Sequence, residues 1–236
     1  MEFKGTIGLI GARGGSKRIP LKNIKLLGNY PLIAYSIFTS RASYFIDKTI
    51  VSTDSPEIAK VAYDYEAKII MRPKELASDT STDYDWISHA LGELRKRDGI
   101  YPENIVFLRP TSPFRCTSTV DTAISSFKKE NTSLVSLEPI SEAIEKTFRI
   151  TEEGMVIPAY PNITIEETGN PNQMFPITYK ANGYVDILRT EHILYAKSLY
   201  GNKIQSFISP KTIDIDTLED WEYATFKLEG MYGLKE

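Results

Sequence analysis

The sequence predicts an α/β protein with a mostly parallel sheet that has helices on both faces. Through the first half of the chain, short apolar runs alternate with segments whose apolar residues recur at helical spacing. The composition is that of an ordinary globular protein, with 42% hydrophobic and 25% charged residues. The length of 236 residues is near the upper range for one compact domain. We therefore expect a single domain over residues 1–236.

The expected elements follow one another with recognisable start and stop signals. Gly11 ends the first strand, Pro31 suits a first helical turn, 52–56 is a helix-start signal and Asp216 opens the last helix. The predicted strands are 6–10, 49–51, 68–70, 105–108, 133–137, 183–188 and 204–208. The predicted helices are 31–41, 56–62, 82–97, 120–129, 192–196 and 217–228.

The alternation stops near Pro139, and residues 139–179 show no helical period. A plain loop of this length is unusual in a compact domain, so we expect an excursion of short strands. The alternative is a disordered surface insertion, but aromatic and aliphatic residues favour a packed segment. These residues are Phe148, Ile150, Tyr160, Met174 and Phe175. We expect this inserted arm to be a small β-rich dimerisation element that packs on a partner subunit.

Charge and composition exclude several classes of protein. The formal net charge is -3, and a protein that neutralises many nucleic-acid phosphates normally has a basic excess, so no nucleic-acid partner is expected. A single cysteine, Cys116, cannot form an intrachain disulfide. No apolar stretch is as long as a membrane span, and the N-terminus lacks the pattern of a signal peptide. We expect a cytoplasmic protein without a membrane partner.

A glycine-rich basic segment, residues 11–23, follows the first strand. Its three glycines let the backbone approach a ligand closely, and its N–H groups can form an anion nest. Arg13, Lys17, Arg18 and Lys22 add four positive charges within ten residues. The spacing is neither that of a Walker A loop nor that of a dinucleotide fingerprint. A solvated turn is the alternative, but the position after a first strand favours phosphate binding. The loops after Ile10, Val51, Ile70 and Leu108 should face one crevice, because parallel sheets bind ligands at the carboxyl ends of their strands.

The segment 11–23 resembles the signature of the cytidylyltransferases that activate acylneuraminic and related nonulosonic acids. Four further segments match in order: 72–80, 108–115, 180–183 and 213–217. The resemblance extends from Thr6 to about Leu228 and implies a Rossmann-like nucleotidyltransferase fold and a homodimer. It also implies a reaction in which the anomeric hydroxyl of a sugar acid attacks the α-phosphorus of CTP and pyrophosphate leaves.

The resemblance assigns a nucleotide site to the first two segments. It implies that Arg13 and Lys22 contact the phosphates, that Asn23 lies near the nucleotide and that Arg72 helps to hold the cytosine base. The whole expected nucleotide set is Ala12, Arg13, Gly14, Gly15, Ser16, Lys17, Lys22, Asn23, Arg72, Ser81 and Asp83.

Two carboxylates near the end of the chain form a candidate Mg²⁺ site. If residues 213–217 are extended, Asp214 and Asp216 point to the same side and can reach one cation. Asp216 also has the position of a helix cap, so Asp214 is the sharper candidate. The expected catalytic set is Arg13, Lys22 and Asp214.

The remaining matched segments supply candidate contacts to the sugar acid, namely Arg109, Thr111, Ser112, Gln173, Lys180 and Asn182. Relatives that use acylneuraminate carry glutamine in place of Arg109, and arginines in place of Asn172 and Lys180. We therefore hypothesise that the substrate is a 2-keto-3-deoxy sugar acid held from a different side, with Arg109 compensating for the missing charge. Two alternatives stay open: a sugar nucleotidyltransferase with another nucleotide or sugar, and a non-catalytic nucleotide-binding relative.

Overall fold

The computed structural model describes residues 5–232. The chain divides into two compact units. The larger unit contains the residues up to 136 together with those from 182, and the smaller unit is Leu137–Ala181. Among the described residues, no helix combines the length and apolar character needed to cross a bilayer.

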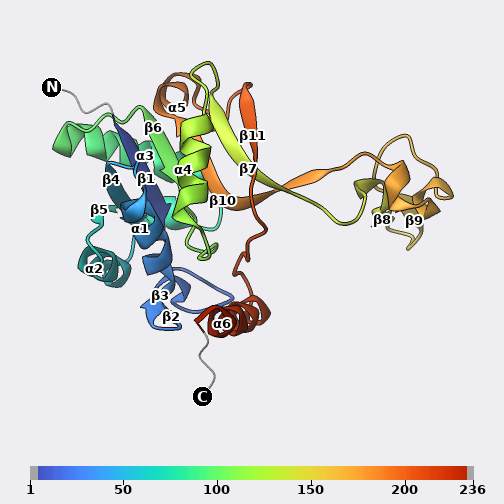
Figure 1. Ribbon diagram of the computed structural model, residues 1–236, viewed down its shortest axis with the longest axis horizontal. Coiled ribbons are helices and arrows are strands. Elements are labelled where there is room, and N and C mark those ends of the chain that lie inside the picture. The colour runs from blue at the N-terminus through green and yellow to red at the C-terminus, as the bar shows by residue number, and fades with distance from the viewer. Residues whose placement is uncertain (1–4, 233–236) are drawn as a thin grey trace. The chain divides into compact units, whose positions relative to one another are not determined.

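A seven-stranded sheet is the centre of the larger unit (Figure 1). Its order is β11-β7-β10-β6-β1-β4-β5. The strands are β1 (Thr6–Gly11), β4 (Lys48–Thr53), β5 (Lys68–Met71), β6 (Asn104–Phe107), β7 (Ser133–Pro139), β10 (Tyr179–Arg189) and β11 (Ile204–Ile208). β1 pairs in parallel with β4 and with β6, and β4 pairs in parallel with β5. β10 pairs with β6 in the antiparallel direction. The expectation of a mostly parallel sheet is confirmed.

Helices cover both faces of this sheet, as the alternation predicts. Three of them pack on one face through Ile37 of α1, Ile58 of α2 and Val120 of α4. The opposite face packs against Trp86 of α3 and Ile193 of α5. The bounds are α1 (Leu32–Ala42), α2 (Pro56–Asp64), α3 (Asp83–Asp98), α4 (Thr117–Ser126) and α5 (Thr190–Ala196).

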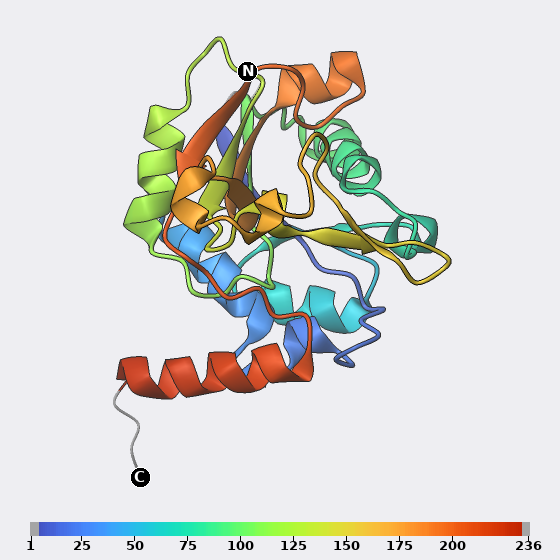
Figure 2. The same cartoon turned by 90° about the vertical axis from the view of Figure 1, so that its right-hand side faces the viewer.

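The last helix, α6 (Leu218–Tyr232), belongs to a third cluster of apolar side chains. Trp221 and Leu228 of this helix pack with Ile19, which follows the glycine-rich segment, and with Ile215. In both views α6 lies beside the hairpin of β2 (Leu26–Leu27) and β3 (Tyr30–Pro31) (Figures 1 and 2). The C-terminal part of the chain is thereby brought next to the segment that follows β1.

Local capping explains where the helices that flank the site begin. The Ser55 hydroxyl accepts from the backbone N–H of Ile58, and Pro56 occupies the first turn of α2, as the start signal at 52–56 predicts. Thr82 and Asp85 form a reciprocal capping box at the start of α3.

Several boundaries differ from the sequence-based expectation by one to four residues. α4 begins at Thr117 and ends at Ser126, whereas the prediction was 120–129, because its first turn is polar and carries no apolar spacing. Residues 211–216 form no regular strand, although Ile215 is buried between the exposed Asp214 and Asp216. A backbone hydrogen bond of 2.8 Å from Ile215 to the carbonyl of Thr111 anchors this segment.

The smaller unit contains an antiparallel hairpin of β8 (Phe148–Ile150) and β9 (Val156–Pro158). Short 3-10 helices accompany it at Ile144–Lys146, Glu167–Gly169 and Asn172–Met174. The expected short strands are present. The apolar residues Phe148, Ile150, Tyr160 and Met174 are nevertheless 40% to 75% exposed in the described chain, so these four side chains are not packed in a core of the smaller unit, whereas Phe175 is partly buried.

Gly8 marks a place where β1 and α1 approach so closely that no side chain fits. A Cβ atom built on Gly8 would lie 2.0 Å from the Ser40 hydroxyl, which is buried and bonded to Thr49. We expect Gly8→Ala to lower the free energy of unfolding by about 1–3 kcal/mol through overpacking. Urea denaturation of the purified protein measures this change.

Gly92→Ala is the matched control for that measurement. Gly92 lies on an exposed position of α3, and an added Cβ would meet nothing within 4 Å. The same substitution should here raise the free energy of unfolding by about 0.5–1 kcal/mol, because alanine favours the helix. A Gly8→Ala variant as stable as the parent protein would contradict the proposed close approach.

Candidate functional site

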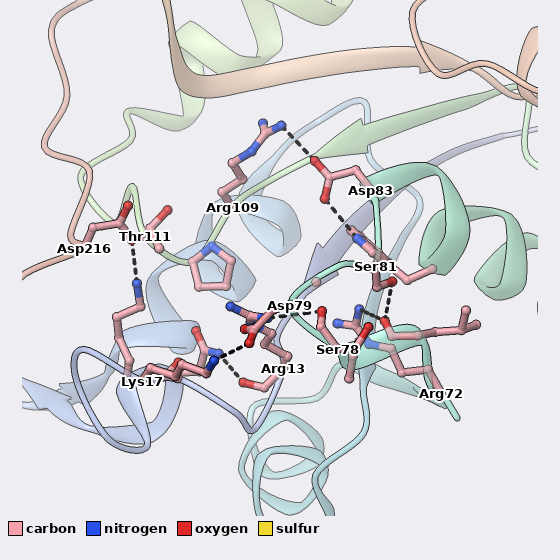
Figure 3. A pocket seen from close by; sticks show the side chains of 18 of the residues that line it. Arg13, Lys17, Arg72, Ser78, Asp79, Ser81, Asp83, Arg109, Thr111 and Asp216 are labelled. Atoms are coloured by element: carbon pink, nitrogen blue, oxygen red, sulfur yellow. Dashed lines mark hydrogen bonds and ion pairs between the residues drawn. The ribbon is translucent and has the colours of Figure 1, made fainter. Parts of the chain in front are cut away.

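A cavity of about 570 Å³ opens at the carboxyl ends of the parallel strands (Figure 3). It is lined from three directions: by the segment after β1, by the segment between β5 and α3, and by the residues after β6. Asp216 lines it from the C-terminal part of the chain. The loops after Ile10, Ile70 and Leu108 thus share one crevice, as expected. The loop after Val51 does not line it, but Ser52 and Asp54 accept hydrogen bonds from Arg72 and Gly14.

The backbone of the glycine-rich segment is held by the protein itself. The backbone N–H of Gly14 donates to Asp54 Oδ1 at 2.9 Å, and that of Ser16 donates to the Gly14 carbonyl at 3.0 Å. The buried Asn23 amide donates to the Arg13 carbonyl at 3.0 Å. The backbone N–H groups of Gly14 and Ser16 therefore have acceptors within the chain. For the other N–H groups of the segment, the anion nest stays a prediction.

The basic side chains of this segment project toward two carboxylates. Arg13 Nη1 lies 3.1 Å from Asp79 Oδ1, and the Lys17 ammonium bonds to the other oxygen of Asp79. Lys22 Nζ donates to the Ile215 carbonyl at 2.8 Å and to Asp216 Oδ1 at 2.9 Å. All four cations, including Arg18 at 3.9 Å from Asp216, line the cavity. Ala12, Gly14 and Gly15 do not line it.

Arg72 and Trp86 form the inner wall of the cavity. The Arg72 guanidinium is buried 4.9 Å above the indole ring and donates to the Ser52 carbonyl at 2.9 Å. Burial lowers the pKa of Arg72 to about 10. The indole Nε1 donates to Asp83 Oδ1 at 3.0 Å. A Cβ on Gly11 would lie 2.6 Å from the indole, so only glycine fits at the end of β1.

Trp86 is a cavity residue that the sequence analysis missed. The signal that would have found it is its position one helical turn after Asp83, at the start of the predicted helix 82–97. Ser81, which was predicted, lines the same wall and donates to the Leu76 carbonyl at 2.9 Å.

Arg109 lies at the end of β6 among acidic groups. Its Nη1 is 2.7 Å from Asp186 Oδ2, and its Nη2 is 3.4 Å from Asp83 Oδ2 and 3.5 Å from the Tyr200 hydroxyl. The guanidinium also stacks 4.1 Å from the Phe107 ring. Burial acts to lower the pKa of Arg109, but the charge and the hydrogen bond of Asp186, together with the charges of Tyr200 and Asp83, outweigh burial and raise this pKa. Both terminal nitrogens therefore already contact carboxylates of the protein.

The other sugar-site candidates differ in burial and in the compact unit to which they belong. Thr111 lines the cavity, whereas Ser112 is fully buried and its hydroxyl has no hydrogen-bond partner in the described part of the chain. Asn182 is buried and donates to the Ser209 hydroxyl at 2.8 Å. Gln173 and Lys180 lie in the smaller unit, where Lys180 pairs with Glu138 at 3.2 Å.

The two candidate metal ligands differ in their placement. Asp216 lines the cavity, whereas Asp214 is exposed and does not. Within residues 5–232, no group of three or more histidine, cysteine or acidic side chains converges to hold an ion. Mg²⁺ commonly uses only one or two protein carboxylates together with substrate phosphates, and the hard oxygens of this pair fit that requirement.

Comparisons with known proteins agree with this architecture. CMP-N,N'-diacetyllegionaminic acid synthase of Legionella pneumophila is 35% identical over 219 residues, which cover 91% of this chain and 92% of the relative. N-acylneuraminate cytidylyltransferase of Escherichia coli is 30% identical over 92% of this chain, but only 51% of that relative is covered. The chain therefore spans about half the length of the second protein.

A solved structure shows the same fold. CMP:2-keto-3-deoxy-manno-octonic acid synthetase in complex with CTP superposes with a TM-score of 0.71 at 15% identity, covering 97% of this chain and 100% of that one. A family model described as cytidylyltransferase matches residues 7–220, which include the lining segments of the cavity and Asp216. Since this match extends over most of the sequence, the chain belongs to the cytidylyltransferase family.

Proposed function

We propose that the chain transfers CMP from CTP to the anomeric hydroxyl of a 2-keto-3-deoxy sugar acid and releases pyrophosphate. The substrate class is the sialic, legionaminic, pseudaminic or a related acid. The observation that carries this proposal is the single cavity that combines the four cations of the glycine-rich segment with the wall formed by Arg72 and Trp86. Its relatives from Legionella pneumophila and Escherichia coli bear names of this activity.

The basic side chains would act on the triphosphate. In the reaction, the sugar hydroxyl oxygen bonds to the α-phosphorus, and the bond from the α-phosphorus to the oxygen that bridges to the β-phosphorus breaks. Pyrophosphate leaves with that oxygen and its electron pair, and the hydroxyl proton passes to solvent water. Arg13, Lys17 and Lys22 lie where they would neutralise the charge that develops on pyrophosphate. Lys22 is the best fixed of these, since its side chain is only 12% exposed and has two acceptors. Alignment of the reactants supplies a further part of the rate enhancement.

The wall around Trp86 would hold the base. Arg72 is fixed by backbone carbonyls and by the indole, and Ser81 and Asp83 lie beside it at the cavity surface. Polar groups fixed in this way can read the hydrogen-bond edge of cytosine. The sugar acid would then lie toward Arg109 and Thr111, which line the same cavity after β6.

We assign Mg²⁺ to Asp216, with Asp214 as a second candidate ligand. Mg²⁺ held by these carboxylates would supply charge neutralisation and polarisation at the phosphoryl oxygens. Asp216 lies beside Lys22 and lines the part of the cavity to which we assign the triphosphate, which supports this proposal. We further propose a cytoplasmic homodimer, in which the exposed apolar residues of the arm at 139–179 form the contact between subunits.

The decisive assay measures pyrophosphate release from CTP with a panel of 2-keto-3-deoxy sugar acids. We expect turnover with CTP and Mg²⁺ and none above background with UTP, GTP or ATP. Turnover with another nucleotide would instead favour a sugar nucleotidyltransferase of different base specificity. The absence of turnover with every acid and nucleotide would favour a binding protein without catalysis.

Lys22→Met tests the phosphate site. Loss of a charge-assisted contact that forms with the leaving group should lower kcat/KM for CTP about 100-fold or more. Lys60→Met, on an exposed position of α2 outside the cavity, is the control and should retain normal kinetics. If the two variants had equal activity and equal thermal unfolding temperatures, the proposal that Lys22 contacts the phosphates would be wrong.

The role of Arg109 is tested together with its partner. Arg109→Gln alone leaves Asp186 buried without its counter-ion, which is strongly destabilising, so the double variant Arg109→Gln with Asp186→Asn is used. We expect KM for the sugar acid to rise about tenfold through loss of a charged hydrogen bond, with KM for CTP little changed. An unchanged KM for the sugar acid would refute the hypothesis that Arg109 contacts it.

A further inference from the structure

Asp79 is a cavity residue to which neither the sequence analysis nor the proposed function assigns a role. It follows the 3-10 helix Lys74–Ala77 and reaches across the cavity to the segment after β1 (Figure 3). Its two carboxylate oxygens contact different cations: Oδ1 lies 3.1 Å from Arg13 Nη1, and Oδ2 bonds to the Lys17 ammonium.

The Asp79 carboxylate therefore occupies the position beside Arg13 and Lys17 that a phosphate group of the nucleotide is expected to take. Arg13 and Lys17 both line the cavity, and Arg13 also donates to the Ser78 carbonyl at 3.2 Å. The hydrogen bond and the charge of Lys17 lower the pKa of Asp79, followed by the effect of Arg13, so the carboxylate is ionised at neutral pH. A phosphate group could engage both cations only if Asp79 moved away from them.

The ion pairs of Asp79 with Arg13 and Lys17 are exposed, so a phosphate anion can replace the carboxylate. The side chain of Asp79 is 50% exposed, that of Arg13 40% and that of Lys17 76%. Pairs of this exposure stabilise a fold little. A purely structural explanation therefore accounts poorly for a carboxylate that links two cations inside the cavity.

We infer that Asp79 is a resident counter-ion of the phosphate site. Before nucleotide binds, Asp79 keeps Arg13 and Lys17 directed into the cavity. The phosphates of the bound nucleotide displace its carboxylate, and the two ion pairs form again when pyrophosphate leaves. The nature of the ligand rests on the proposed function. Asp79 is thus a positioning residue, and the exchange favours polyphosphates, whose several charges outcompete one carboxylate, over weaker anions.

The test is the affinity for inorganic pyrophosphate, measured by isothermal titration calorimetry at low ionic strength. Asp79→Asn keeps the shape of the side chain and removes the competing charge. We expect the dissociation constant for pyrophosphate to be about 3- to 10-fold lower in Asp79→Asn than in the parent protein. The reason is that pyrophosphate no longer has to break two exposed ion pairs. Raised salt should reduce the difference.

Asp64→Asn is the matched control. Asp64 is exposed on α2 and does not line the cavity, so this variant changes the net charge equally and should bind pyrophosphate like the parent protein. Kinetics give a second readout: Asp79→Asn should lower KM for CTP and the inhibition constant of pyrophosphate without raising kcat. A merely structural role would not shift these constants in that direction.

The outcomes separate this inference from the proposed function. An unchanged or higher dissociation constant for pyrophosphate in Asp79→Asn, with normal thermal unfolding, overturns the resident counter-ion, because Asp79 would then be neutral toward the phosphates or assist them. Failure of the parent protein to turn over CTP overturns the proposed function, whereas the pyrophosphate titration still decides whether Asp79 competes for the cations.

Discussion

The arrangement of the cavity depends on one electrostatic constraint: four basic side chains from ten consecutive residues line it together and repel one another. Repulsion between them is relieved by carboxylates that arrive from elsewhere in the chain. Asp79 from the segment before α3 faces Arg13 and Lys17, and Asp216 from the segment before α6 faces Lys22. A parallel sheet makes this possible, because it brings the carboxyl ends of several strands to one edge.

Close packing beneath the cavity fixes the orientation of the groups above it. Gly11 lets the indole of Trp86 lie against the end of β1, and the indole in turn carries Arg72 and bonds to Asp83. The Asp54 carboxylate accepts a hydrogen bond from the backbone N–H of Gly14. The glycines of this segment therefore serve close approach of protein groups as much as approach of a ligand. The sequence did not indicate that Asp54 would accept the hydrogen bond of the Gly14 N–H.

The sequence predicted what depends on local pattern. The helix expected at 82–97 is α3 (Asp83–Asp98), because its apolar spacing and its capping residues agree. The crevice followed from the topology of a parallel sheet. Long-range pairing was not predictable: nothing near Arg109 in the sequence indicates Asp186, and nothing near Lys17 indicates Asp79. Similarly, Asp214 and Asp216 are both exposed on either side of the buried Ile215, as alternation predicted, but of this pair Asp216 alone lines the cavity.

The charge around Arg109 changes how an anionic sugar would have to be recognised. Arg109 lies between Asp186 and Asp83, so this group of one cation and two carboxylates has no positive excess. Long-range attraction of a carboxylate must then come from the loop cations, which Asp79 and Asp216 neutralise only in part. Arg109 can still offer a directed hydrogen bond, since stacking on Phe107 and the ion pair with Asp186 fix its plane. In the proposed function, the loop cations would thus attract the anionic substrates, whereas Arg109 after β6 would orient the sugar acid.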